Sequence, residues 1–272
     1  MNTITVGDGL KLAVQDLGTG PSVVLVGGMF LDRRIWDQQV CSLTEAGYRV
    51  VCIDLLGHGE SDQPLSGYAI PELAGQLVEA MRLLEVGRGL LVGHSFAGQV
   101  AFSAAVQGAD LAGLVLLSSN GVAAARTAGF PFGAPAEALL PALVTGERTA
   151  KFATRKKNLL VSFGADPVPE LVDWLLAMVL QTPSWVALEF YRTLLTCDQS
   201  DLVARARLPI LHLYGEDDPI LARKAVPWLV EQLPDLTSAT LPGGHYPMLE
   251  AGQALSEALL AFCDRVGIAV VA

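Results

Sequence analysis

Short apolar runs alternate along this chain with segments of helical periodicity, and this alternation limits the folds that the sequence can adopt. The apolar runs are residues 23–26, 50–54, 90–93, 114–118 and 210–214, with a weaker sixth run at 238–241. The first five are nearly continuous in apolar residues, as expected of strands covered on both faces. Amphipathic segments separate the runs at 35–46, 70–84, 99–106 and 222–232. The alternation predicts a doubly wound α/β fold with a mostly parallel sheet and flanking helices.

Two further strands are predicted ahead of these runs. Residues 3–6 and 11–16 flank Gly7-Asp8-Gly9. An Asp-Gly turn between alternating residues is typical of an antiparallel hairpin, here at the edge of the sheet. With the hairpin, we expect the sheet to contain eight strands.

The segment between about residues 121 and 209 interrupts the alternation. It contains no convincing strand, but it has helical stretches at 136–143, 171–181 and 185–195, separated by prolines. We interpret this segment as an all-helical lid inserted after the sixth strand, and expect a substrate pocket between lid and sheet. The predicted division is a core of residues 1–121 and 207–272 with a lid of residues 122–206.

Composition excludes several classes of partner. The chain has 18 basic and 28 acidic residues, a formal net charge of −10, which disfavours binding to nucleic acid. Its one basic cluster, Arg155-Lys156-Lys157, is interpreted as a solvated helix face. No run approaches the roughly 18 apolar residues of a membrane span. The N-terminus lacks the pattern of a secretory signal, so we expect a cytoplasmic protein. The oligomeric state stays open between a monomer and a homo-oligomer.

The strongest chemical feature is a serine at a predicted strand-to-helix junction. Residues 90–98 read LLVGHSFAG, so Ser95 lies between a buried strand and a helix of small residues. This is the setting of a nucleophile elbow, where a strained turn exposes the serine hydroxyl. The turn requires small residues on both sides of the serine. Gly93 and Gly98 meet this requirement, and Ala97 replaces the usual glycine with one extra methyl group.

Four further segments stand in the order that the α/β-hydrolase superfamily shows. They are residues 23–29 (VVLVGGM), 53–62 (IDLLGHGESD), 214–220 (YGEDDPI) and 243–247 (GGHYP). With the elbow, the chain resembles the lid-bearing branch of this superfamily: esterases, lactonases, carbon–carbon bond hydrolases and cofactor-free haloperoxidases. The resemblance covers the whole length except the lid, and it implies a nucleophile, an acid and a histidine in that chain order.

A serine needs a base to accept its proton, and the chain offers four histidines. His94 adjoins the nucleophile and cannot fold back onto it, and His212 lies within a predicted strand, so both are expected to be packing residues. His58 lies in a loop that resembles a structural element of the family. His245 follows two glycines after the last strand, at the edge where the nucleophile lies. We therefore predict His245 as the base.

The third member must hold the imidazole in one tautomer and stabilise its charged form. Glu216, Asp217 and Asp218 all follow the predicted strand at 210–214. The family resemblance selects Asp218, with Asp217 or Glu216 as the alternative if Asp218 caps the next helix. Asn120 occupies the position of the acid in some relatives, but an amide cannot supply the charge.

The resemblance also implies the groups that would stabilise an oxyanion. They are the backbone N–H groups of Phe96, after the nucleophile, and of Met29, in the oxyanion strand. Gly27 stands where the family has a histidine, which predicts unfilled space or flexibility under this loop.

Residues expected to border the substrate pocket come from the oxyanion loop, the lid and the histidine loop. They are Gly28, Phe30, Trp185 and Tyr246.

Together these features predict a serine hydrolase that cleaves a small, largely apolar carboxylic ester, lactone or related acyl compound through an acyl-enzyme. We expect no metal or cofactor, since the chain has neither metal-ligand spacing nor a dinucleotide fingerprint. The alternatives are a carbon–carbon bond hydrolase, or a cofactor-free perhydrolase, oxygenase or lyase on the same fold. From another class, the alternative is a ligand-binding receptor.

Overall fold

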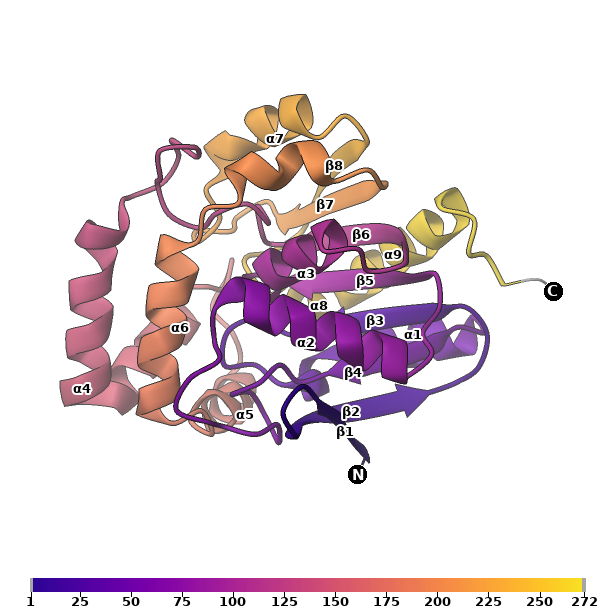
Figure 1. Ribbon diagram of the computed structural model, residues 1–272. Coiled ribbons are helices and arrows are strands. Elements are labelled where there is room, and N and C mark those ends of the chain that lie inside the picture. Colours follow the sequence, from indigo (N-terminus) through magenta and orange to yellow (C-terminus); the bar gives the residue numbers. More distant parts are fainter. Residues whose placement is uncertain (1, 271–272) are drawn as a thin grey trace.

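The computed structural model describes residues 2–270, and its centre is one eight-stranded sheet (Figure 1). The strand order is β1-β2-β4-β3-β5-β6-β7-β8. The strands are β1 (Asn2–Val6), β2 (Leu10–Leu17), β3 (Ser22–Val26), β4 (Arg49–Ile53), β5 (Gly89–His94), β6 (Leu111–Leu117), β7 (Ile210–Gly215) and β8 (Leu236–Leu241). Only β1–β2 and β2–β4 pair antiparallel, which confirms the predicted edge hairpin and the mostly parallel sheet.

Helices cover both faces of the sheet, as a doubly wound fold requires. On one face α2 and α3 lie side by side, and on the other α1 lies against α9 (Figure 1). The core helices are α1 (Asp37–Glu45), α2 (Ile70–Leu83), α3 (Phe96–Val106), α7 (Val226–Gln232), α8 (Pro247–Glu250) and α9 (Gly252–Arg265). Short 3-10 helices are η1 (Arg33–Trp36), η2 (Ser200–Arg205) and η3 (Arg223–Ala225). Every residue of β3, β5 and β6 is buried, which explains their continuous apolar composition.

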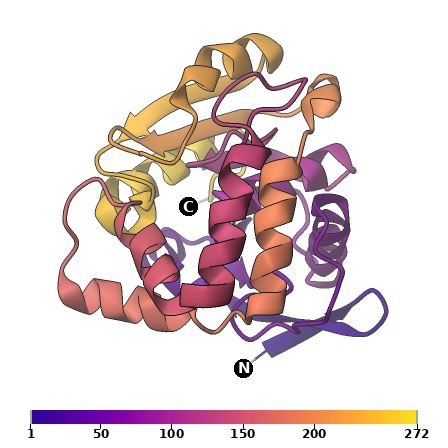
Figure 2. The same cartoon turned by 90° about the vertical axis from the view of Figure 1, so that its left-hand side faces the viewer.

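Three helices are inserted between β6 and β7, and they form a group at one end of the molecule (Figure 2). They are α4 (Ala136–Leu160), α5 (Pro169–Val179) and α6 (Ser184–Thr196). The sequence predicted α5 and α6 closely, but it predicted only the first third of α4. The predicted stretch ended at residue 143, whereas α4 continues to Leu160 through a bend at Ala150, which has non-helical backbone angles (φ −149°, ψ 43°).

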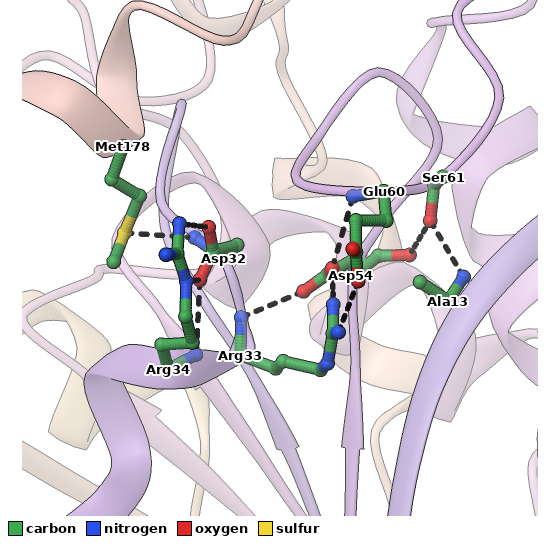
Figure 3. Close-up of polar contacts among 8 residues, drawn as sticks. All are labelled: Ala13, Asp32, Arg33, Arg34, Asp54, Glu60, Ser61 and Met178. Atoms are coloured by element: carbon green, nitrogen blue, oxygen red, sulfur yellow. Dashed lines mark hydrogen bonds and ion pairs between the residues drawn. The ribbon is translucent and has the colours of Figure 1, made fainter. Parts of the chain in front are cut away.

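A polar loop after β4 connects the edge hairpin to the centre of the sheet (Figure 3). The buried Asp54 carboxylate accepts hydrogen bonds from the backbone N–H of Arg33 at 2.6 Å and from its guanidinium at 2.5 Å. The Ser61 hydroxyl donates to the Asp54 carbonyl at 2.7 Å and accepts from the N–H of Ala13 at 2.9 Å. Gly59 has φ +48°, and a Cβ there would lie 2.2 Å from the Asp54 carboxylate. The loop is therefore a structural element that fixes the chain around β2 and β4.

The Asp54 carboxylate predicts how stability depends on pH. Burial raises its pKa from 3.8 to about 6, although the charge and hydrogen bonds of Arg33 lower it. A raised pKa means that the folded state binds the proton more tightly than the unfolded state. The ionised form therefore costs stability progressively as pH rises from about 4 to about 6. We expect the free energy of unfolding of wild type to fall by about 2 kcal/mol relative to Asp54→Asn between pH 4.5 and pH 7.

Urea denaturation of both proteins at pH 4.5 and pH 7 measures this difference in the free energy of unfolding. If wild type instead gains stability relative to Asp54→Asn as pH rises, pairing with Arg33 outweighs burial.

Candidate active site

Ser95 lies at the turn between β5 and α3 in a strained backbone conformation. Its φ is 52° and its ψ is −117°, a region that residues other than glycine rarely adopt. The turn is held because neighbouring chains press closely against it. A Cβ at Gly93 would lie 2.5 Å from the carbonyl of Ala97, and one at Gly98 would lie 2.3 Å from the Ser119 hydroxyl. The serine is therefore presented as in a nucleophile elbow.

The alanine of the elbow does not disturb this geometry. Ala97 is fully buried, and its methyl group packs into the hydrophobic core. The position that tolerates no side chain is the next one, Gly98, because the side chain of Ser119 fills the space beside it. Alanine therefore replaces the usual glycine at a position where one methyl group can be accommodated.

A continuous chain of hydrogen bonds joins Ser95, His245 and Asp218. The Ser95 Oγ lies 2.8 Å from His245 Nε2, and His245 Nδ1 lies 2.8 Å from Asp218 Oδ2. The other carboxylate oxygen of Asp218 accepts from the N–H groups of Ile220 at 2.8 Å and Leu221 at 3.0 Å. Burial raises the pKa of Asp218, but the hydrogen bond and charge of His245 and these two N–H groups bring it below its usual value. The carboxylate is thus ionised and oriented toward the imidazole.

The alternative acids take no part in this chain of contacts. Glu216 and Asp217 are exposed, whereas Asp218 is 1% exposed. Asn120 is buried just after β6, and its side-chain oxygen Oδ1 has no hydrogen-bond partner among the described residues. Asp218 does cap the turn that follows, so one side chain holds the local backbone and contacts His245.

The other histidines are buried and lie in structural positions. Nε2 of His94 donates to the carbonyl of His245 at 2.8 Å, so this residue supports the histidine loop from below. Burial lowers the pKa of His94 to about 3 and those of His58 and His212 to about 4. Nδ1 of His58 contacts the carbonyl of Leu56, and Nδ1 of His212 contacts the hydroxyl of Ser238. All three are neutral packing residues at neutral pH.

The loop that carries His245 is fixed by Glu250, a residue that the sequence analysis did not single out. The Glu250 carboxylate accepts hydrogen bonds from the N–H groups of Gly164 at 2.8 Å, Gly244 at 2.9 Å and Tyr246 at 3.1 Å. The N–H of His245 itself donates to the carbonyl of Ser162 at 2.8 Å. The imidazole is thus held through its backbone by Glu250 and by the chain that follows α4. The sequence signal that could have identified Glu250 is the position of an acidic residue five residues after His245.

The two backbone N–H groups predicted to bind an oxyanion come from Met29, in the loop after β3, and from Phe96, at the start of α3. No described residue accepts a hydrogen bond from the N–H of Met29 or of Phe96. Gly28 allows the loop to approach the elbow, because a Cβ there would lie 3.0 Å from Ser95 Cβ. The space expected beside Gly27 is filled. A Cβ at that position would lie 3.3 Å from the side chain of Ile35, which is 1% exposed.

Ser95 and His245 open onto a cavity of about 480 Å³ between the sheet and the inserted helices. The wall is mainly apolar and comes from the core loops and from α4, α5 and α6. Met29, Phe30 and Tyr246 line the cavity, whereas Gly28 lies beside it against the elbow.

Trp185 was predicted wrongly as a pocket residue. Its side chain is 51% exposed, and it does not line the cavity. The buried stripe of α6 runs through Val186, Phe190 and Tyr191, and the helical period places Trp185 outside it.

Arg155 is also placed differently from the prediction of a solvated helix face. It is 2% exposed and forms a buried ion pair with Glu147, with nitrogen–oxygen distances of 2.7 and 3.0 Å. Its guanidinium donates to the carbonyls of Val179 and Thr182 and lies 4.6 Å from the ring centre of Phe30. One side of the cavity is therefore lined by a charge that is already neutralised.

The geometry agrees with comparisons to known proteins. The model of the alpha/beta hydrolase family matches residues 23–258. The chain belongs to this family. It is 28% identical over 215 residues to the AB hydrolase superfamily protein YisY of Bacillus subtilis, covering 78% of this chain and 79% of that protein. It is 28% identical over 275 residues to a non-heme chloroperoxidase of Streptomyces lividans, covering 96% of this chain and 99% of that protein.

A solved structure with the same fold is the esterase EaEST from Exiguobacterium antarcticum. It superposes with a TM-score of 0.91 at 22% identity, over 96% of this chain and 98% of the esterase. The predicted fold family is thus confirmed, and its members similar to this chain include enzymes, esterases among them.

Within residues 2–270, no single helix has the length and apolar composition to cross a membrane. The pair α5 and α6 together reaches that length and composition, but the two helices are bent by 97°.

Glu250 generates a prediction about His245. Glu250→Ala removes the acceptor of three backbone N–H groups, so the histidine loop should shift and His245 should lose its alignment with Ser95. We expect a fluorophosphonate to label Ser95 about 10- to 100-fold more slowly than in wild type. Glu257→Ala is the matched control, because Glu257 is exposed on α9 and contacts only Gln253. Equal labelling rates in both variants would show that Glu250 does not position the imidazole.

Proposed function

We propose that this protein is a serine hydrolase that cleaves a small, largely apolar carboxylic ester, lactone or related acyl compound. The observation that carries the proposal is the chain Asp218–His245–Ser95, with two contacts of 2.8 Å, at the wall of a mainly apolar cavity. A serine hydroxyl becomes a useful nucleophile when an oriented base accepts its proton. These residues have the order and the geometry for that role.

The reaction would proceed in two halves. Ser95 Oγ attacks the substrate carbonyl carbon while His245 Nε2 takes the hydroxyl proton, and Asp218 stabilises the resulting imidazolium. The tetrahedral oxyanion accepts hydrogen bonds from the N–H groups of Met29 and Phe96, each worth about 2.7–4 kcal/mol in such a site. The carbon–oxygen bond to the alkoxide then breaks, and His245 returns the proton to that oxygen. Water, deprotonated by His245, attacks the acyl-enzyme and releases the acid and Ser95.

The cavity supports the choice of substrate class. About 480 Å³ lies within the range of small-molecule sites, and the mainly apolar wall favours an apolar acyl or alcohol group. The buried ion pair of Arg155 with Glu147 at the wall is internally neutral. We further propose that residues 122–206 act as a lid over this cavity, since α4, α5 and α6 supply much of its wall.

One observation favours a second candidate. Similarity to a non-heme chloroperoxidase suggests a perhydrolase, in which hydrogen peroxide rather than water attacks the acyl-enzyme. The same residues would serve, and the product would be a peracid. Peracid formation from an ester and hydrogen peroxide, lost in Ser95→Ala, would separate this reaction from hydrolysis.

Ser95 predicts the outcome of covalent labelling. Intact-protein mass after exposure to a fluorophosphonate should show one adduct on wild type and none on Ser95→Ala. Ser162→Ala is the matched control, because this serine also lines the cavity, and its contact with His245 is made by the backbone carbonyl, which the substitution keeps. The control should carry one adduct. An unlabelled wild type, folded by circular dichroism, would contradict an activated serine.

The proposed role of Asp218 predicts that its substitution lowers activity, whereas the same substitution at the neighbouring Asp217 does not. Asp218→Asn should lower kcat/KM for an activated ester about 10³- to 10⁴-fold, because the amide favours the wrong imidazole tautomer. Asp217→Asn makes the same chemical change one residue away on an exposed side chain, and kcat/KM should stay close to wild type. Loss in the Asp217 variant with activity kept in the Asp218 variant would reassign the acid.

A further inference from the structure

The cavity wall contains one buried hydroxyl group that the proposed reaction does not use. Tyr191, on α6, lines the cavity and is 1% exposed. Its hydroxyl makes no hydrogen bond to any residue between 2 and 270. Buried polar groups are nearly always paired, so an unpaired one at a ligand cavity indicates that a ligand or water supplies the partner.

The ring of Tyr191 is held firmly, so its hydroxyl has a defined direction. It packs edge-on against Phe30, with ring centres 5.5 Å apart at 84°. The Arg155 guanidinium also lies against Phe30, at 4.6 Å. Phe30 follows Met29, whose N–H is proposed to bind the oxyanion. The ring of Tyr191 is therefore packed against the loop that carries the proposed oxyanion donor, and its buried hydroxyl belongs to a residue of the cavity wall.

The chemistry of the surroundings favours a neutral partner. Burial and the charge of Glu147 raise the pKa of Tyr191 to about 12, against smaller lowering effects of the Arg155 charge and the adjacent Asn158 side chain, so the hydroxyl keeps its proton at neutral pH. Asn158 also lines the cavity and carries both a donor and an acceptor. Arg155 does not attract an anion, because its charge is paired with Glu147 and its N–H groups are directed to that carboxylate and to two carbonyls.

We propose that Tyr191 and Asn158 form a subsite for a neutral oxygen of the substrate, remote from the bond that is cleaved. This inference rests on the proposed function and makes its substrate class narrower. The preferred substrates are esters or lactones that carry a ketone, ether or hydroxyl oxygen on the portion held by the cavity. A purely alkyl chain of equal length would bury the Tyr191 hydroxyl without a partner and is therefore discriminated against.

The test compares p-nitrophenyl esters of equal chain length. One is a plain alkanoyl ester, one set has an ether or ketone oxygen at successive positions, and one ends in a carboxylate. For wild type, the best oxygenated ester should exceed the plain ester about tenfold in kcat/KM, the size of a neutral hydrogen bond. In Tyr191→Phe the plain and oxygenated esters should become nearly equal, because only the hydroxyl is lost and the ring contacts remain.

Tyr68→Phe is the matched control. Its hydroxyl donates to the carbonyl of Pro64 at 2.7 Å, and the residue does not line the cavity. This variant should keep the wild-type preference. Loss of the preference in both variants would indicate a general effect of removing a buried hydroxyl and would overturn the assignment to Tyr191.

A second arm separates failure of this inference from failure of the proposed function. Calorimetric titration of the Ser95→Ala protein with the plain and oxygenated esters measures binding without turnover. Tighter binding of the oxygenated ester, lost when Tyr191→Phe is added, supports the subsite even if wild type hydrolyses no ester. Hydrolysis of all esters with equal kcat/KM, or a preference for the carboxylate, overturns the subsite and leaves the serine hydrolase in place.

Discussion

Close packing around a strained turn is the constraint on which the rest of the active site depends. Ser95 keeps a positive φ, at a cost of about 1–3 kcal/mol, because β5, α3 and the end of β6 leave the turn no alternative path. Glycines at 28, 93 and 98 let three backbone segments approach within a distance that a methyl group would prevent. The serine hydroxyl thus has one position, and the other groups of the site are arranged around it.

The imidazole of His245 depends on contacts from separate parts of the chain. His94 supports its carbonyl, Ser162 receives its N–H, and Glu250 ties the adjoining residues to Gly164. Two of these contacts come from the segment directly after α4. The insertion therefore does more than line the cavity, because its segment between α4 and α5 is hydrogen-bonded to the loop that carries His245.

Sequence patterns predicted the sheet and the turn at Ser95 because both depend on local signals, whereas Asp218 was selected by resemblance to the family. Continuous apolar runs mark buried strands, and the small residues around Ser95 mark the turn. The insertion was less predictable, since its side chains are placed by contacts between helices that have no fixed spacing in the sequence. From the sequence, Arg155 was interpreted as part of a basic surface cluster. In the structure the bent helix α4 brings Glu147, eight residues earlier, beside it. Trp185 was predicted to line the pocket because the sequence does not show which face of α6 is buried.

The buried ion pair in the insertion also affects how a molecule can enter the cavity. Glu147 and Arg155 belong to α4, while their partners include the carbonyl of Val179 in α5 and the hydroxyl of Ser184 in α6. Separating α5 or α6 from α4 would leave the ion pair intact, but it would take away the carbonyl or the hydroxyl that completes the hydrogen bonding of these buried charges, which is unfavourable. The three helices are therefore expected to move together rather than one at a time if the cavity widens to take up a molecule.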